Sequence, residues 1–157
     1  MRFFTGELWK GINGMSDVYD IETADEIFLK NIQKYNEYFD TEVARVLPKE
    51  TLELYKKYAG FHDMEIIKLQ YEKNEFCIYG KTVNIIFNGV KELRGNLIGI
   101  IDTFGYMEIL YREATDDFQI GILFSWEDSI YITCSSIVVK EQEQPEDVSL
   151  SVAFQTN

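Results

Sequence analysis

The chain has 157 residues, of which 46% are hydrophobic and 15% aromatic, and its 27 acidic and 15 basic side chains give a net charge of −12. This length fits one domain, and the composition is that of a globular protein with a sizeable core. The negative charge repels phosphate backbones and anionic lipid surfaces, so it argues against nucleic-acid and membrane partners.

The N-terminal stretch MRFFTGELWKG has no long apolar run after its first basic residue. We therefore expect neither a secretory signal nor a membrane-spanning segment, and a soluble protein of the cytoplasm. Cys77 and Cys134 lie far apart in runs typical of strands and form no CxxC motif. They are predicted to be two buried thiols in a reducing compartment.

Helical periodicity extends from about Asp20 to about Arg45. Apolar residues recur there at steps of three and four: Ile21, Ala24, Phe28, Ile32, Tyr35, Phe39 and Val43. Thr23 and Glu26 have the spacing of a capping box, so Thr23 is an alternative to Asp20 as the start of the helix. Several acidic residues near this start are attributed to the helix dipole, and they lack the pattern of a calcium loop: Asp17, Asp20, Glu22, Asp25 and Glu26.

A second helix is predicted after Pro48, because proline fits the first helical turn. Its apolar face consists of Leu52, Tyr55, Tyr58 and Ala59. Gly60 is expected to end it in the left-handed cap conformation.

After Gly60 the period changes to two, which indicates strands separated by short polar turns. The runs are MEIIKLQY, EFCIYG, KTVNIIFNG, a segment around Met107 to Tyr111, DDFQIGILFSW, SIYITCSSIVV and DVSLSVAF. Lys73-Asn74, Thr115 to Asp117 and Glu127-Asp128 are predicted turns, and KEQEQPED is predicted to be a solvated loop. The segment from Lys91 to Gly105 gives no clear pattern.

These patterns predict a single α+β domain over 1–157, mainly helical in 1–60 and mainly antiparallel β in 61–157. The N-terminal helices are expected to pack on a curved antiparallel sheet of about six or seven strands. The predicted core contains Phe28, Ile32, Phe39, Ile67, Leu69, Ile120, Ile122 and Phe124.

The only histidine, His62, precedes Asp63 and is the strongest candidate for chemistry. Such a pair can orient a base or supply metal ligands, but neighbouring strand residues point to opposite faces unless the strand is bulged or has not yet begun. No second histidine is present to complete a metal site. We therefore favour a structural role, with both side chains bonded to the backbone between helix and strand. No cofactor or metal site is predicted.

Other patterns also favour structural roles. Asp116-Asp117 could suggest the paired acids of glycoside hydrolysis, but a hairpin turn explains them. The glycines at 89, 95 and 99 match neither a P-loop nor a dinucleotide motif, and no nucleophile elbow is present.

The segment Arg2-Phe3-Phe4-Thr5, with Glu7-Leu8-Trp9 and later His62-Asp63, resembles a family of small bacterial proteins, mostly from Firmicutes, grouped as a domain of unknown function. Gly6 stands where that family has lysine. The resemblance implies a cytoplasmic bacterial accessory protein and carries over no catalytic residues.

The favoured function is a non-enzymatic protein-binding module, of immunity or regulatory type, whose acidic surface recruits a basic protein. The alternative is a small enzyme or ligand-binding domain with a cleft around His62. A structural subunit of a homo-oligomer is a third reading, and the sequence leaves the oligomeric state open.

Overall fold

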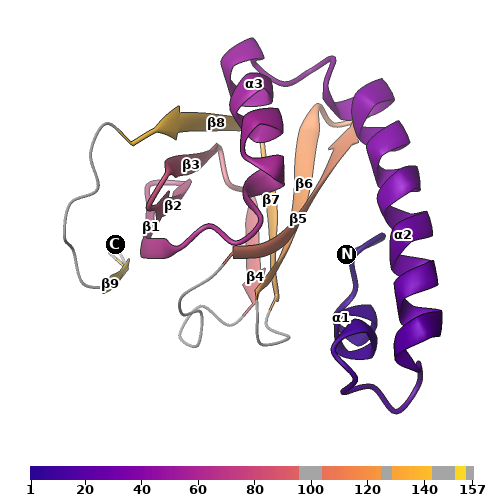
Figure 1. Cartoon of the computed structure of the whole chain (residues 1–157). Coiled ribbons are helices and arrows are strands. Elements are labelled where there is room, and N and C mark those ends of the chain that lie inside the picture. The colour runs from indigo at the N-terminus through magenta and orange to yellow at the C-terminus, as the bar shows by residue number, and fades with distance from the viewer. Residues whose placement is uncertain (96–103, 125–128, 143–150, 155–157) are drawn as a thin grey trace.

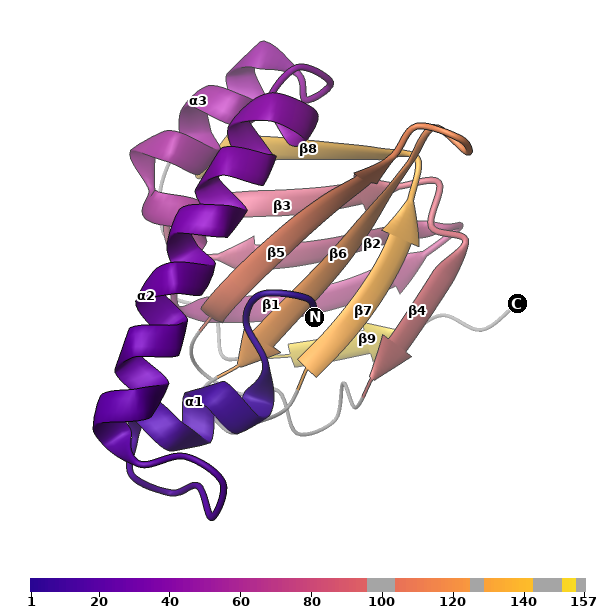
Figure 2. The same cartoon turned by 90° about the vertical axis from the view of Figure 1, so that its right-hand side faces the viewer.

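The computed structural model describes residues 1–95, 104–124, 129–142 and, by backbone alone, 151–154. Two β-sheets pack face to face with their strands crossing obliquely, and the helices lie along one side of the pair (Figure 1 and Figure 2). The predicted α+β class is confirmed. The predicted single curved sheet is wrong, because the strands divide between two sheets.

The first sheet has the strand order β8-β3-β2-β1-β9 and the second has the order β4-β7-β6-β5. The strands are β1 Ile66–Glu72, β2 Glu75–Gly80, β3 Val83–Asn88, β4 Glu92–Gly95, β5 Phe104–Arg112, β6 Asp117–Phe124, β7 Ser129–Cys134, β8 Ser136–Glu141 and β9 Ser151–Phe154. All neighbours are antiparallel except β9, which pairs with β1 in parallel.

The chain changes sheet at two polar junctions. Between β3 and β4, the N–H of Lys91 bonds to the carbonyl of Thr133 and brings the chain to the second sheet. Between β7 and β8, the N–H of Ser135 bonds to the carbonyl of Asn88 and returns it to the first sheet. The run SIYITCSSIVV is therefore two strands in different sheets.

The core lies between the two sheets. Strand β3 contributes Val83, Ile85 and Phe87, and β6 contributes four alternating residues, all of them buried: Phe118, Ile120, Ile122 and Phe124. Five of the eight predicted core residues are buried, whereas Phe28, Ile32 and Ile67 are only partly so. A β-bulge between Ile66 and Lys68 explains the error in β1, because it buries Ile66 in place of Ile67.

Three α-helices precede the sheets: α1 Gly6–Ile12, α2 Ile21–Tyr38 and α3 Lys49–Lys57. A π-helical segment η1, Phe39–Val43, continues α2, and a short 3₁₀ segment η2, Ala59–Phe61, follows α3. Gly60 adopts the predicted left-handed conformation, with a φ of 68°, but it does not end the second helix: α3 ends at Lys57 with Tyr58 as its C-cap, and Gly60 lies within η2. Pro48 caps α3 immediately before its first residue.

The predicted capping box at the start of α2 is wrong. Asp20 caps this helix, and its carboxylate accepts the N–H of Thr23 at 2.7 Å. The helix therefore begins earlier than Thr23, and only Glu22 among the clustered acids lies within its first turn. Asp25 and Glu26 lie beyond the reach of the helix-end effect.

The helical segments cover an edge of each sheet and not the face of a single sheet. Segments η1 and η2 contact β5, and α3 contacts β8 (Figure 2). The predicted turn at Lys73-Asn74 is confirmed as a two-residue hairpin loop, with both residues at positive φ. The predicted turn at Glu127-Asp128 and most of the loop after Glu141 lie outside the described residues, as do most of Lys91 to Gly105.

Candidate functional site

His62 and Asp63 lie between η2 and β1, where the chain turns sharply through four residues of positive φ: Ala59, Gly60, Phe61 and Asp63. The strand begins only at Ile66, so the two side chains are free to meet. The Nδ1 atom of His62 lies 2.9 Å from a carboxylate oxygen of Asp63. The strand has therefore not yet begun at His62, which is the condition under which the sequence allowed the two side chains to act together.

The hydrogen bonds predicted from these two side chains to the backbone do not occur among the described residues. The backbone N–H of Asp63 donates to the carbonyl of Phe104 at 2.8 Å, and the N–H of Phe104 donates to the carbonyl of Met64 at 2.8 Å. These bonds connect the junction to the start of β5. The His62 ring instead packs on Tyr106, with the ring centres 4.6 Å apart.

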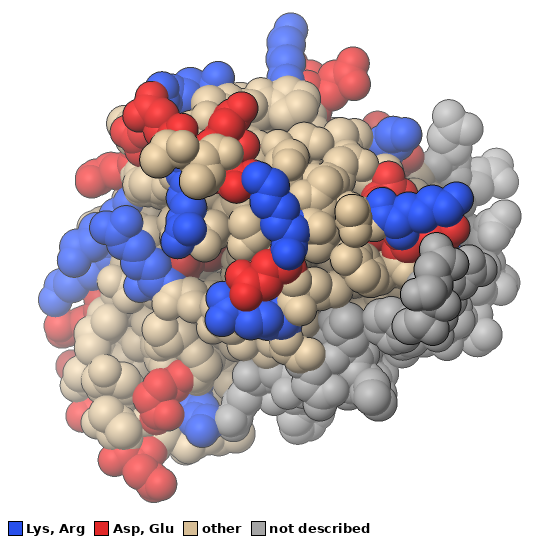
Figure 3. Space-filling view, turned by 180° about the vertical axis from the view of Figure 1, so that it is seen from behind, with Lys and Arg blue, Asp and Glu red and all other residues tan. Residues whose placement is uncertain are grey.

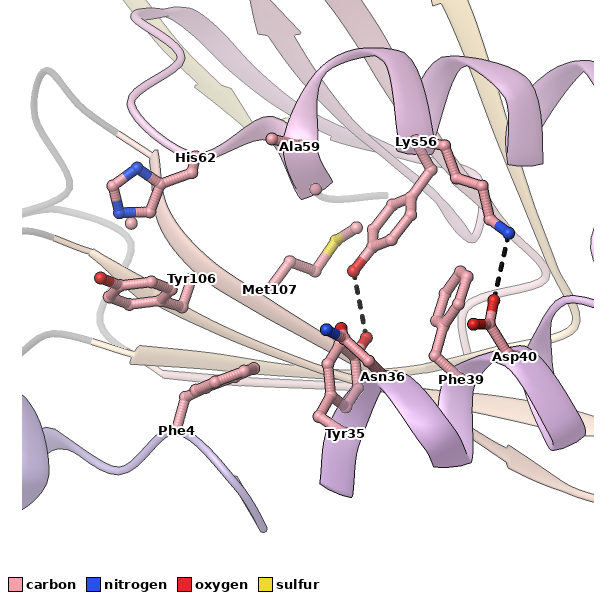
Figure 4. A pocket seen from close by; sticks show the side chains of 13 residues that line it. Phe4, Tyr35, Asn36, Phe39, Asp40, Lys56, Ala59, His62, Tyr106 and Met107 are labelled. Carbon is pink, nitrogen blue, oxygen red and sulfur yellow. Dashed lines mark hydrogen bonds and ion pairs between the residues drawn. The ribbon is translucent and has the colours of Figure 1, made fainter. Parts of the chain in front are cut away.

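A groove of about 420 Å³ opens beside His62, between the end of α2, the end of α3 and β5 (Figure 4). Its walls are mainly aromatic and come from four parts of the chain. Phe4 stacks on Tyr106 at 5.4 Å between ring centres, and Phe39 stacks on Tyr55 at 4.6 Å. Phe39 begins the π-helical segment η1, and π-helical turns occur frequently at functional sites.

Two buried tyrosine hydroxyls form the polar part of the groove floor. The hydroxyl oxygens of Tyr35 and Tyr55 lie 3.2 Å apart, and the Tyr35 oxygen accepts the N–H of Ile109 at 2.9 Å. Burial raises the pKa of Tyr55 to about 12 and raises the pKa of Tyr35 well above its ordinary value. Both hydroxyls are therefore neutral near pH 7 and serve as hydrogen-bonding groups, not as bases.

The two ends of the groove differ in charge. At one end the ammonium of Lys56 binds Asp40 at 3.1 Å, and the side chain of Asn36 also lines the space (Figure 4). Beyond His62 and Tyr106 the groove continues into a second hollow, lined by Asp25, Asp63, Trp9 and Asn13 among others. Carboxylates thus predominate at the second end.

The other sequence candidates do not join this site. Asp116 lies in the hairpin turn as predicted, whereas Asp117 begins β6, is 5% exposed and binds Lys91. Cys77 and Cys134 are both buried and free, and burial raises their pKa to about 11 and about 12. Such thiols are protonated near pH 7 and poorly nucleophilic.

In the part of the chain that the structure describes, no group of three or more His, Cys, Asp or Glu side chains is placed to hold a metal ion. Among the same residues, no helix combines the length and the apolar character that crossing a membrane requires.

Sequence reasoning missed a buried carboxylate. Glu108 lies in the segment predicted as a strand around Met107 to Tyr111, and its side chain is 1% exposed. Its two oxygens accept the backbone N–H groups of Arg2, Phe3 and Phe4 at 2.5, 2.7 and 3.2 Å. This binding places Phe4 in the groove wall. The alternation of β5 alone gives no signal for it, because the donors come from the opposite end of the chain.

In comparisons with known proteins, no family model matches the chain, and no curated protein matches its sequence.

Proposed function

We propose that this chain is a non-enzymatic binding protein, of regulatory or immunity type, which holds part of a partner protein in the groove beside His62. The observation that carries the proposal is the groove itself. Two phenylalanines and three tyrosines are among its thirteen lining residues. Tyrosine and other aromatic residues are enriched where protein interfaces are strongest.

The polar groups of the groove suit binding better than catalysis. The Tyr35 and Tyr55 hydroxyls are held neutral, and Lys56 is paired with Asp40. His62 pairs with the exposed carboxylate of Asp63. A nucleophile within reach of a base, the arrangement that covalent catalysis needs, does not occur among the described groove residues.

The net charge of −12 supports a basic partner, although the acidic residues do not cover the surface uniformly. Figure 3 shows the face that points away from the viewer in Figure 1, and on this face acidic and basic side chains lie next to one another. The α1–α2 region differs, because it carries exposed Asp17, Asp20, Glu22 and Asp25. We propose that the partner approaches at this end of the groove and that its binding weakens with salt.

Site-specific photo-crosslinking in the native cells tests the proposal. A photoreactive amino acid replaces Asn36, which lines the groove, or Lys34, which is exposed on the opposite side of α2. We expect one protein to be crosslinked from position 36 and not from position 34. In lysate, we expect the yield of this crosslink to be lower at high salt than at low salt. Equal labelling from both positions, or none, contradicts the proposed function.

A small-molecule site around His62 is the second candidate. The volume of the groove supports it, since drug-sized ligands occupy clefts of roughly 300–1,000 Å³. Native mass spectrometry of protein purified from its own cells distinguishes the two. A small-molecule adduct that is lost on Asn36→Ala would favour this candidate over a protein partner.

A further inference from the structure

Strand β5 is an edge of the second sheet. An edge strand leaves backbone N–H and C=O groups pointing outward, and proteins usually cover them. Here the chain supplies its own partners along most of the edge. Phe104 bonds to the Asp63–Met64 backbone, the N–H of Ile109 donates to the Tyr35 hydroxyl, and Tyr111 bonds through both its N–H and its C=O to the Tyr38 hydroxyl.

One position on this edge is left without such a partner. From Tyr106 to Arg112 the pairing of β5 with β6 is regular, so residues two apart present their backbone groups to the same edge. The N–H and C=O of Met107 therefore face the same way as those of Ile109 and Tyr111. Neither group bonds to the described part of the chain on that edge, and Met107, which is only 3% exposed, lines the groove.

The gap fits one residue of an extended peptide. In an antiparallel pair, one residue donates its N–H to the facing C=O and accepts the facing N–H in return. Longer pairing is blocked, because Met64 occupies the edge at Phe104 and Tyr35 occupies it at Ile109. The aromatic walls on either side accept an apolar side chain, so the backbone supplies affinity and the walls supply selectivity.

The charge of the adjoining hollow selects the neighbouring residue. Asp25 and Asp63 lie in that hollow, and no lysine or arginine lines it among the described residues, although His62 also lines it and pairs with Asp63. At the other end, Lys56 is neutralised by Asp40. A lysine or arginine next to the paired residue would therefore be attracted to the Asp25 and Asp63 end.

We propose that the groove binds an extended peptide segment in which one apolar or aromatic residue pairs with the backbone of Met107 and an adjacent basic residue extends toward Asp25 and Asp63. This inference rests on the proposed function and specifies the part of the partner that is recognised.

The probe is the capped peptide acetyl-Lys-Phe-Lys-amide, whose charges are the same in either direction along β5. We expect its addition to the ¹⁵N-labelled protein to shift the amide resonances of Gly105 and Met107 and to slow hydrogen exchange at Met107. The analogue with an N-methylated phenylalanine lacks the pairing donor, and we expect it to bind at least about tenfold more weakly.

Charge variants test the second half of the proposal. We expect the D25N and D63N substitutions together to weaken binding of the lysine peptide about two- to fivefold, the range for exposed ion pairs. D17N is the matched control, because Asp17 is exposed and lies outside both hollows. The glutamate analogue acetyl-Glu-Phe-Glu-amide is expected to bind more weakly than the lysine peptide.

Three results would overturn this inference: no shift at Met107, equal affinity for the N-methylated analogue, or a Met107 shift that depends on protein concentration alone and so reports a second copy. If crosslinking from position 36 still captures one partner, the proposed function survives while the peptide-pairing inference fails. If crosslinking also fails, both are wrong.

Discussion

The carboxylate of Glu108 shows how much a single residue contributes to this molecule. It is buried on β5 and satisfies three consecutive backbone donors of the N-terminal segment. A buried carboxylate is costly unless it is fully hydrogen-bonded, and these three bonds provide that compensation. The N-terminal segment and the buried charge therefore depend on each other.

We expect Glu108→Gln to lower the free energy of unfolding by roughly 1.5–3 kcal/mol, the range for hydrogen bonds to a charged group. The amide replaces one acceptor oxygen with a donor, so amide exchange at Phe3 and Phe4 should accelerate as well. Urea unfolding and hydrogen exchange measure the two effects. Glu113→Gln, at a side chain 82% exposed, is the control and should change neither.

The ion pair of Lys91 with Asp117 makes stability depend on pH. The Lys91 ammonium lies 2.6 Å from one carboxylate oxygen and lowers the pKa of Asp117. Because the pKa is lower in the folded state, the pair stabilises the fold above the ordinary carboxyl pKa of about 4. This stabilisation is lost as the pH falls through the lowered pKa.

Asp117→Asn should therefore be less stable than the parent at neutral pH, and the difference should shrink as the solution is acidified below about pH 4. Urea unfolding over a pH series tests this expectation, with Asp17→Asn as the exposed control. A stability difference that stays constant with pH would show that the ion pair is not responsible.

The exposure of His62 in the structure indicates that removing its side chain lowers the free energy of unfolding only slightly. Its side chain is 38% exposed and its partner Asp63 is 76% exposed, so no buried group loses its bond in His62→Ala. We expect a loss below about 1 kcal/mol, the range for exposed pairs, and not the 1–3 kcal/mol of a stranded buried partner. A larger loss of unfolding free energy in urea would show that the contact of His62 with Tyr106 stabilises the fold more than the exposure of His62 indicates.

At the scale of elements, α2 acts as a cover for the edge of β5. Two tyrosines on its inner side, Tyr35 and Tyr38, supply hydroxyls to the backbone of Ile109 and Tyr111. This arrangement blocks an edge that would otherwise be open to other strands, and among the described residues it leaves the short gap at Met107. The helix thus determines where the candidate site is.

We expect Tyr35→Phe to cost about 1–3 kcal/mol, because it leaves the buried N–H of Ile109 without a partner. Tyr38→Phe should cost less, since its bonds to Tyr111 are only part-buried and water can replace them. Tyr71→Phe is the control, because the Tyr71 hydroxyl has no bond to a described residue. Chemical denaturation should give the order Tyr35, Tyr38, Tyr71.

At the scale of the whole molecule, stability comes from the layer between the two sheets. Phe124 is 2% exposed in this layer and packs edge-on against Phe104, with ring centres 6.1 Å apart. We expect Phe124→Ala to cost roughly 3–5 kcal/mol in denaturant unfolding. Leu29→Ala, at a residue 61% exposed, should cost little, and a similar loss in both would contradict this assignment of the core.

The sequence by itself determined the local features. The helical stripe through Tyr35, Phe39 and Val43, the left-handed Gly60, the Lys73-Asn74 turn and the alternation of β3 and β6 all follow from interactions between residues close in the chain. Periodicity and turn chemistry report such interactions directly. The class α+β follows from them.

Only the tertiary structure decided how the elements combine. Alternation does not reveal that the chain changes sheet at Ser135, because a residue's backbone partner lies far away in sequence. The burial of Glu108 depends on donors more than a hundred residues distant, and the groove depends on Phe4, Tyr35, Tyr55 and Met107 meeting. Contacts between distant residues are set by the packing of the whole core, and the pattern along the chain does not encode them residue by residue.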